Sequence, residues 1–180
     1  SIHLDRYHVD ELREILRARA NRGLSAGVVD DRRLEQIADG VAGVARVGIQ
    51  SLRAAAEIAA ERDHRKILED DVDDSFERAR YRIRRSNLRS LPLHHHVLYA
   101  IIHQAEDGEI AGGDLHARYD AVAEHVYRGS DLVPIGKRAR RNKLQKLREY
   151  DLVERDGPTY RVSDVAIPAE VSLPEVESRN

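Results

Sequence analysis

Apolar residues recur every three or four positions through the first half of the chain, which is the spacing of amphipathic helices. The spacing covers four segments: Asp10 to Ala20, Asp30 to Gly40, Ile49 to Ala59, and Glu69 to Ile83. Glycines separate the first three segments, and glycine ends helices readily. The acidic stretch at 69–74 suits the positive end of a helix dipole. The pattern therefore predicts a four-helix bundle.

The second half has a different order of elements. The pattern predicts helix 97–105, strand 109–111, helix 115–126, helix 134–150, and strands 152–155 and 159–162. Asp156, Gly157 and Pro158 separate the last two strands, and these are typical turn residues. A helix, a short strand, two helices and a hairpin follow one another in a winged helix.

A change of character near Ser90 divides the chain. The arginine-rich stretch that ends at Arg89 gives way there to Leu91, Pro92 and Leu93. We predict a mainly α fold with a four-helix bundle at 1–90 and a winged-helix domain with a small β-hairpin at 91–164. The polar residues 165–180 are expected to form a flexible tail.

Composition narrows the class of protein. The 180 residues are 41% hydrophobic and 34% charged but only 4% aromatic, which favours an aliphatic, helical core. The chain has no Cys and no Met, which excludes disulfides, thiolate metal sites and cysteine nucleophiles. No run of about 18 apolar residues occurs. We expect a cytoplasmic protein that does not enter membranes.

The segment 134–150 holds seven positive residues and one acid, Glu149. Steps of 100° per residue place its apolar residues on one side: Ile135, Ala139, Leu147 and Tyr150. The opposite side carries Lys137, Arg138, Arg141, Asn142, Gln145 and Arg148. Arginine can bind guanine, Asn and Gln can bind adenine, and any cation can bind phosphate. We predict that this side contacts DNA in the major groove. The alternative is a solvated helix surface.

Other basic residues give weaker signals. On the predicted hairpin, Arg155 and Arg161 are candidate phosphate contacts, opposed by Asp156 at the tip. A second basic run at 78–89 either forms an exposed connecting helix or contacts the DNA backbone.

Catalytic and metal sites are not predicted. His94, His95 and His96 fan out at 100° intervals on a helix, so they cannot all face one ion. The acidic stretch at 69–74 lacks the glycine and spacing of a calcium loop. No spacing pairs a nucleophile with a base, and no glycine-rich phosphate loop is present.

Arg46 lies near the predicted start of the third helix, where a cation faces the positive end of the helix dipole. Beside helix amide groups, an arginine can bind a phosphate that a neighbouring domain supplies. The alternative is an ordinary surface arginine.

Five segments together form a familiar pattern: Tyr7–Arg19, Gly43–Ala56, Ile67–Val72, Leu91–Ile102 and Pro134–Val153. The pattern resembles the C-terminal part of archaeal replication initiators of the origin recognition complex and cell-division-control family. The resemblance covers nearly the whole chain. It implies that the first half is the helical lid of an AAA+ ATPase. The second half would then be a winged helix that binds duplex DNA at replication origins.

The resemblance also implies cofactors and partners. Arg46 matches the lid arginine that touches the terminal phosphate of ATP, although Val44 replaces a residue that is often small or acidic. Arg138 matches a basic position early in the recognition helix. ATP or ADP and magnesium would bind only with an ATPase core upstream of Ser1, so we expect a longer AAA+ protein. The implied partners are the replicative helicase and other initiator subunits, at the nucleoid.

Two other interpretations stay open. The chain could be a stand-alone winged-helix transcription regulator whose first four helices dimerise or sense a ligand. It could also be a winged-helix module that docks onto proteins, which would have little affinity for DNA even at about 50 mM salt.

Overall fold

Two compact units divide the chain in the computed structural model, residues 1–83 and 84–180. The structure describes residues 7–175. The change of unit falls within helix α4 (Glu69–Arg89), a few residues before the boundary placed at Ser90. The limits 1–90, 91–164 and 165–180 stay predictions. Among the described helices, none is both long and apolar enough to cross a membrane.

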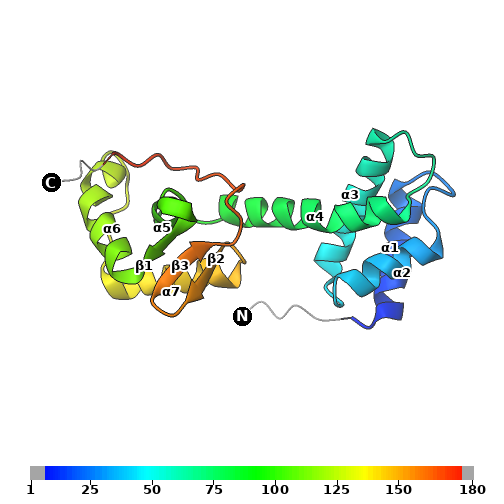
Figure 1. Cartoon of the computed structure of the whole chain (residues 1–180), viewed down its shortest axis with the longest axis horizontal. Helices are drawn as coiled ribbons and strands as arrows, with labels where there is room; N and C mark the ends of the chain where they lie inside the picture. The colour runs from blue at the N-terminus through cyan, green and yellow to red at the C-terminus, as the bar shows by residue number, and fades with distance from the viewer. Residues whose placement is uncertain (1–6, 176–180) are drawn as a thin grey trace. The chain divides into compact units, whose positions relative to one another are not determined.

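Unit 1 is the bundle that the apolar spacing predicts (Figure 1). Its helices are α1 (Val9–Gly23), α2 (Asp31–Gly40), α3 (Ala45–Glu61) and the first part of α4. Asp30 caps α2 by accepting a hydrogen bond from the backbone N–H of Arg33 at 2.9 Å. The core is aliphatic, and its most buried members are Leu12, Leu16, Leu34, Ile37, Ala38, Ala55 and Val72.

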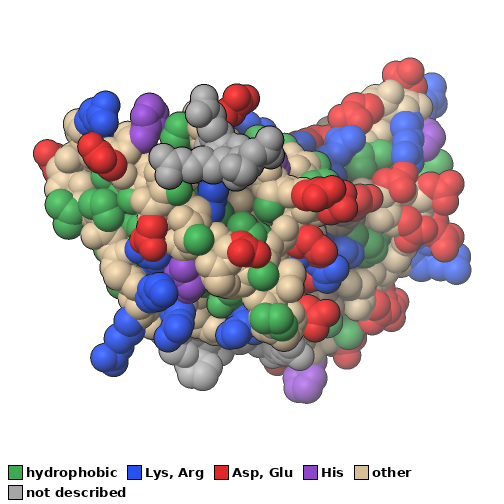
Figure 2. Space-filling model, turned by 60° about the vertical axis from the view of Figure 1, so that its left-hand side comes forward, with side chains coloured by type: hydrophobic (Ala, Val, Ile, Leu, Met, Phe, Trp, Pro, Cys, Tyr) green, Lys and Arg blue, Asp and Glu red, His purple; other side chains and the backbone are tan. Residues whose placement is uncertain are grey.

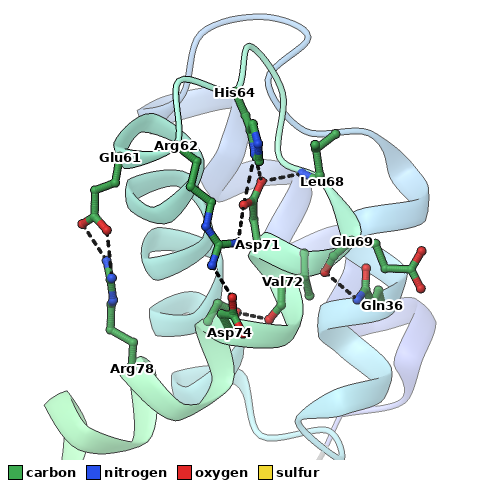
Figure 3. A network of polar contacts seen from close by, with 11 residues as sticks. Gln36, Glu61, Arg62, His64, Leu68, Glu69, Asp71, Val72, Asp74 and Arg78 are labelled. Atoms are coloured by element: carbon green, nitrogen blue, oxygen red, sulfur yellow. Dashed lines mark hydrogen bonds and ion pairs between the residues drawn. The ribbon is translucent and has the colours of Figure 1, made fainter.

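A buried carboxylate joins the end of α3 to the start of α4 (Figure 3). The fully buried side chain of Asp71 accepts hydrogen bonds from the Leu68 N–H (2.9 Å) and from Arg62 (3.0 Å). Its other contact is His64 Nδ1, at 2.9 Å. Arg62 also pairs with Asp74. The acidic stretch at 69–74 therefore holds the α3–α4 connection together, in addition to facing the helix dipole.

Unit 2 has the predicted order of helix, strand, helix, helix and hairpin (Figure 1). After α4 come α5 (Leu93–His103), a 3-10 turn (Glu106–Gly108), β1 (Glu109–Ala111), α6 (Gly112–Tyr127), α7 (Lys137–Glu149), β2 (Val153–Asp156) and β3 (Thr159–Val162). The three strands form one antiparallel sheet in the order β1-β3-β2. The mainly α fold with a small hairpin is confirmed.

The start of α7 was predicted wrongly. The pattern placed it at Pro134, but the helix begins at Lys137 after the extended residue Gly136. The backbone N–H of Ile135 instead donates a hydrogen bond to the Tyr119 hydroxyl at 3.1 Å. This tertiary contact keeps Pro134 and Ile135 in the turn, although proline is well suited to a first helical turn.

Residues 165–175 were expected to be loosely held, yet they make specific contacts with unit 2. Ile167 is 1% exposed, and its carbonyl accepts a hydrogen bond from the Tyr99 hydroxyl at 2.7 Å. Arg118 donates to the carbonyl of Pro174 at 3.2 Å. Polar composition did not indicate these contacts. The rest of the predicted tail, 176–180, lies outside the described residues.

Candidate nucleic-acid interface

Helix α7 is anchored to unit 2 along one apolar side. Leu144 and Leu147 are 1% and 0% exposed, and Ala139 is partly buried. At the end of the helix, the N–H of Tyr150 donates to the carbonyl of Lys146 at 3.0 Å. Of the predicted apolar side, Ala139 and Leu147 lie within the helix and are partly or fully buried, Leu144 joins them, and Ile135 lies in the turn before the helix.

The opposite side of α7 is exposed. It carries the six residues that the helical projection places there: Lys137, Arg138, Arg141, Asn142, Gln145 and Arg148. We call these six residues the basic face. Within residues 7–175, Arg138 and Arg141 form no ion pair with a carboxylate. Arg148 donates a hydrogen bond to Oε1 of Gln145 at 3.1 Å. The basic face therefore presents positive charge and amide groups to solvent.

The space-filling view shows the setting of this charge. Figure 2 shows Lys and Arg side chains gathered at the lower left of the face that it draws. The four cations of the basic face have no acidic residue among them, because Glu149 is the single acid between 134 and 150. A cationic surface of this kind is the electrostatic footprint of nucleic-acid binding proteins.

Arg140 does not belong to the basic face, although it is one of the seven cations of the segment. It is 5% exposed, and its guanidinium donates to the carbonyl of Ile135 (2.8 Å) and to the carboxylate of Asp120 (2.5 Å). The sequence does contain a signal for this burial. Arg140 precedes Leu144 by four positions and Leu147 by seven, so it lies on their side of the helix.

Two tyrosines fix the turn that leads into α7. The Tyr119 hydroxyl accepts from the N–H of Ile135 and donates to the Tyr127 hydroxyl at 2.9 Å. The Tyr127 oxygen lies 2.7 Å from Nδ1 of His94. Burial, helped by the positive charge of Lys143, lowers the pKa of His94 and so favours a ring that can accept this hydrogen bond.

The hairpin places its two arginines on opposite faces of the sheet. Arg155 stacks over the Tyr160 ring with its guanidinium carbon 5.3 Å from the centroid, and it donates to the carbonyl of Gly157 at 2.9 Å. Arg161 is half exposed and forms a 3.0 Å ion pair with Glu154. Both predicted phosphate contacts of the hairpin are therefore already engaged within the chain.

The second basic run is held mostly by carboxylates of its own unit. In unit 1, two arginines of α4 pair with α3: Arg78 with Glu61 at 2.8 Å and Arg82 with Glu57 at 2.5 Å. In unit 2, Arg84 pairs with Asp151 at 2.8 Å and Arg89 with Glu170 at 2.9 Å. These pairs favour the interpretation of a connecting helix over that of a DNA-binding one.

Arg46 is the second residue of α3, exposed at the end of the helix where backbone N–H groups lack helical partners. The N-cap residue Val44 offers no side-chain hydrogen bond. The first turn of α3 contains no acidic residue. This end of the helix can therefore attract an anion.

Comparison with known proteins identifies the family. A model of the Cdc6 AAA+ ATPase-type lid domain matches residues 13–77. The ORC1-type DNA replication protein 9 of Halobacterium salinarum is 30% identical over 172 residues, 93% of this chain and 46% of that protein. Protein 1 of the same type and organism is 36% identical over 118 residues, 66% of this chain and 38% of that protein. The chain belongs to the archaeal Orc1/Cdc6 family.

A solved structure supports the fold of this Orc1/Cdc6 chain. The Aeropyrum pernix ORC1 protein in complex with DNA matches 88% of the chain with a TM-score of 0.63 and 25% identity, over 44% of its own length. The chain spans less than half the length of these relatives. Because the lid match at 13–77 covers most of unit 1, the predicted lid-like bundle is confirmed, and Arg46 lies within it.

Proposed function

We propose that this chain is the part of an archaeal replication initiator that binds duplex DNA at origins, and that the basic face of α7 is the reader. Three kinds of support converge on the proposal. The family is that of ORC1-type replication proteins. The Aeropyrum pernix relative was solved in complex with DNA. The helix concerned is the second helix of a helix-turn-helix, the position that enters the major groove in such motifs.

The exposed basic face of α7 is the observation that carries the proposal. Leu144 and Leu147 pack the opposite side of the helix against the rest of unit 2. The exposed side chains of α7 can therefore contact DNA without displacing any part of unit 2. In the proposed complex, Arg138 and Arg141 bind guanine edges, and Asn142 and Gln145 bind adenine edges. Lys137 and Arg148 bind phosphates. Arg155, at the tip of the hairpin, is a candidate for a further phosphate contact.

Titration of a labelled duplex of about 30 base pairs, followed by fluorescence anisotropy from about 50 to 300 mM salt, tests the proposal. The double variant Arg138→Ala with Arg141→Ala should bind at least about thirtyfold more weakly, because a bidentate base contact contributes about 1–3 kcal/mol. Its salt dependence should also be shallower. Unchanged affinity and slope would exclude α7 as the reader.

Arg128→Ala is the matched control for the loss of an arginine. The Arg128 side chain is 72% exposed on unit 2 but lies outside α7. Its removal should change affinity by less than about twofold, since long-range charge effects are screened beyond about 10 Å. If the wild-type chain showed no affinity at about 50 mM salt, a protein-docking winged helix would be the better description.

Specificity is expected to come from the two amides of the basic face. Asn142→Ala and Gln145→Ala should reduce the ratio of affinities for a duplex selected from a random pool and for its scrambled counterpart. Each loss should be about 1–3 kcal/mol at the contacted base pair. The salt slope should not change, because neither residue carries charge.

We further propose that Arg46 contacts the terminal phosphate of a nucleotide held by an ATPase core, with which unit 1 acts as the lid. The exposed N-terminal end of α3 fits an anion, and the lid family is that of an AAA+ ATPase. Bound ATP with magnesium would supply the charge that Arg46 senses. Other initiator subunits and the replicative helicase, met at the nucleoid, are the proposed partners.

ATP turnover tests the role of Arg46 in the protein that joins this segment to its ATPase core. Arg46→Ala should slow turnover at least about tenfold, as expected when a charge-stabilising group is removed. Arg53→Ala is the matched control, because Arg53 is exposed on the same helix and pairs with Glu57. Equal turnover by the two variants would exclude Arg46 as a nucleotide contact.

A further inference from the structure

The outer face of the wing sheet is more acidic than basic. Side chains alternate between the two faces of a strand, and the register aligns the three strands. One face thus carries Glu109, Ala111, Glu154, Asp156, Thr159 and Arg161, and we call it the outer face. It has three carboxylates and one cation. The opposite face holds the buried side chains of Val153, Tyr160 and Val162.

Arg161 lies between two of these carboxylates. It is directly opposite Glu109 of β1 on one side and directly opposite Glu154 of β2 on the other. Its guanidinium hydrogen-bonds to Oε2 of Glu154 at 3.0 Å. The hydrogen bond and charge of Glu154, followed by the charges of Glu109 and Asp156, raise the pKa of Arg161. Arg161 is therefore paired, in register, within an acidic surface.

A phosphate that approaches this surface meets a net negative charge. Directly opposed residues on one sheet face lie about 4.5–5.5 Å apart at Cβ, so Glu109 and Glu154 are both close to any phosphate bound by Arg161. Like charges at such distances repel by about 1 kcal/mol even in bulk water. To bind the phosphate, Arg161 would also have to break its ion pair with Glu154.

We propose that Glu154 is a specificity-determining residue, because its ion pair with Arg161 keeps that arginine from binding a DNA phosphate. Duplexes are then bound through α7 without a phosphate contact from the outer face of the wing. The consequence is selectivity. A phosphate contact strengthens binding to every sequence alike, whereas base contacts by α7 distinguish sequences. The inference rests on the proposed DNA binding by α7. It replaces the sequence-based expectation that Arg161 contacts phosphate in the wild-type chain.

Glu154→Gln is the decisive variant, because it removes the charge and keeps the size of the side chain. It should bind a scrambled duplex about three- to tenfold more tightly than wild type at about 50 mM salt, and its salt slope should steepen by about 0.9 for one added phosphate contact. Arg161→Gln alone should change affinity by less than about twofold. The double variant should lose the gain, which assigns the gain to Arg161.

Glu124→Gln controls for net charge, because Glu124 is an exposed carboxylate of unit 2 that pairs with an arginine at 3.6 Å, as Glu154 does at 3.0 Å. It should reproduce less than a third of the gain. The inference is overturned if Glu154→Gln binds no more tightly than this control, or if Arg161→Gln alone weakens binding severalfold. Either result leaves DNA binding by α7 intact. Absence of duplex binding by the wild-type chain would instead remove the proposed function itself.

Discussion

The guanidinium carbon of Arg140 lies 3.9 Å from the centroid of the Tyr119 ring. The same tyrosine receives the N–H of Ile135 from the turn before α7. One buried cation and one ring therefore fix α7 and its preceding turn against α6. The neighbouring residue Arg141, one position along the helix, is exposed. Adjacent arginines thus have separate roles, one in holding the helix and one in the face that it presents.

The pair Arg140 and Arg141 allows stability and binding to be separated. Arg140→Ala removes a buried cation and leaves Asp120 and two backbone carbonyls without their donor. Its free energy of unfolding should fall by about 2–3 kcal/mol through the lost hydrogen bonds and packing, since Asp120 is 59% exposed and stays solvated. Arg141→Ala should cost less than about 0.5 kcal/mol and yet weaken duplex binding. Urea denaturation followed by circular dichroism measures the stability, and equal losses would contradict the assignment.

Asp71 should make the stability of unit 1 sensitive to acid. Burial by itself opposes ionisation of this carboxyl. The hydrogen bonds from His64, the Leu68 N–H and Arg62 outweigh burial and lower its pKa below the usual value. A carboxyl with a lowered folded-state pKa stabilises the fold above the unfolded-state value near 4, and this contribution is lost as pH falls through the folded-state pKa.

Asp71→Asn tests this contribution. The variant should be less stable at pH 7 by about 1–3 kcal/mol, because an amide accepts the hydrogen bonds from Arg62 and His64 more weakly than a carboxylate does. The difference from wild type should shrink below about pH 4. Asp70→Asn is the control, since Asp70 is exposed in the same helical turn. A difference that stayed constant down to pH 3 would contradict the role of the ionised carboxylate.

Periodicity predicted much of this fold because the units are helical and their cores are aliphatic. The burial of Leu34, Ile37 and Leu147 follows from their spacing alone. The same helical periodicity predicted the basic face of α7, because residues opposite the buried apolar side of a helix face solvent. The roles of those exposed residues in binding DNA stay predictions until they are measured.

Contacts between distant residues were beyond this kind of reasoning. The partner of Arg161 depends on strand register, which pairs it with Glu154 and Glu109. The start of α7 depends on a hydrogen bond to Tyr119, sixteen positions earlier. The helical projection of α7 assigned Arg140 to neither side of the helix, and its ion pair with Asp120 of α6 could not be read from the spacing. These features are set by tertiary packing, which a local pattern does not contain.

The turn that leads into α3 and Arg46 requires glycine at position 43. The φ of Gly43 is +80°, and a Cβ there would lie 2.5 Å from the backbone oxygen of Tyr7. Gly43→Ala should therefore lower the free energy of unfolding by more than about 1 kcal/mol. Gly23→Ala, at the end of α1 with open space around it, should instead be neutral or stabilise by up to about 1 kcal/mol. Thermal denaturation of both variants checks the contrast, and similar shifts would contradict it.

His95 should destabilise unit 2 in mild acid. It is 6% exposed in α5, and burial, with a smaller effect of the Lys143 charge, lowers its pKa from 6.5 to about 4. Between these values the unfolded chain binds a proton that the folded chain rejects, so stability falls as pH falls from 6.5 to 4, by about 3 kcal/mol. His95→Leu should remove most of that loss in urea titrations across this pH range. If the free energies of unfolding of the variant and the wild type changed with pH in parallel, another group would be responsible. His94 and His116 would then be replaced next, because burial also lowers their pKa values.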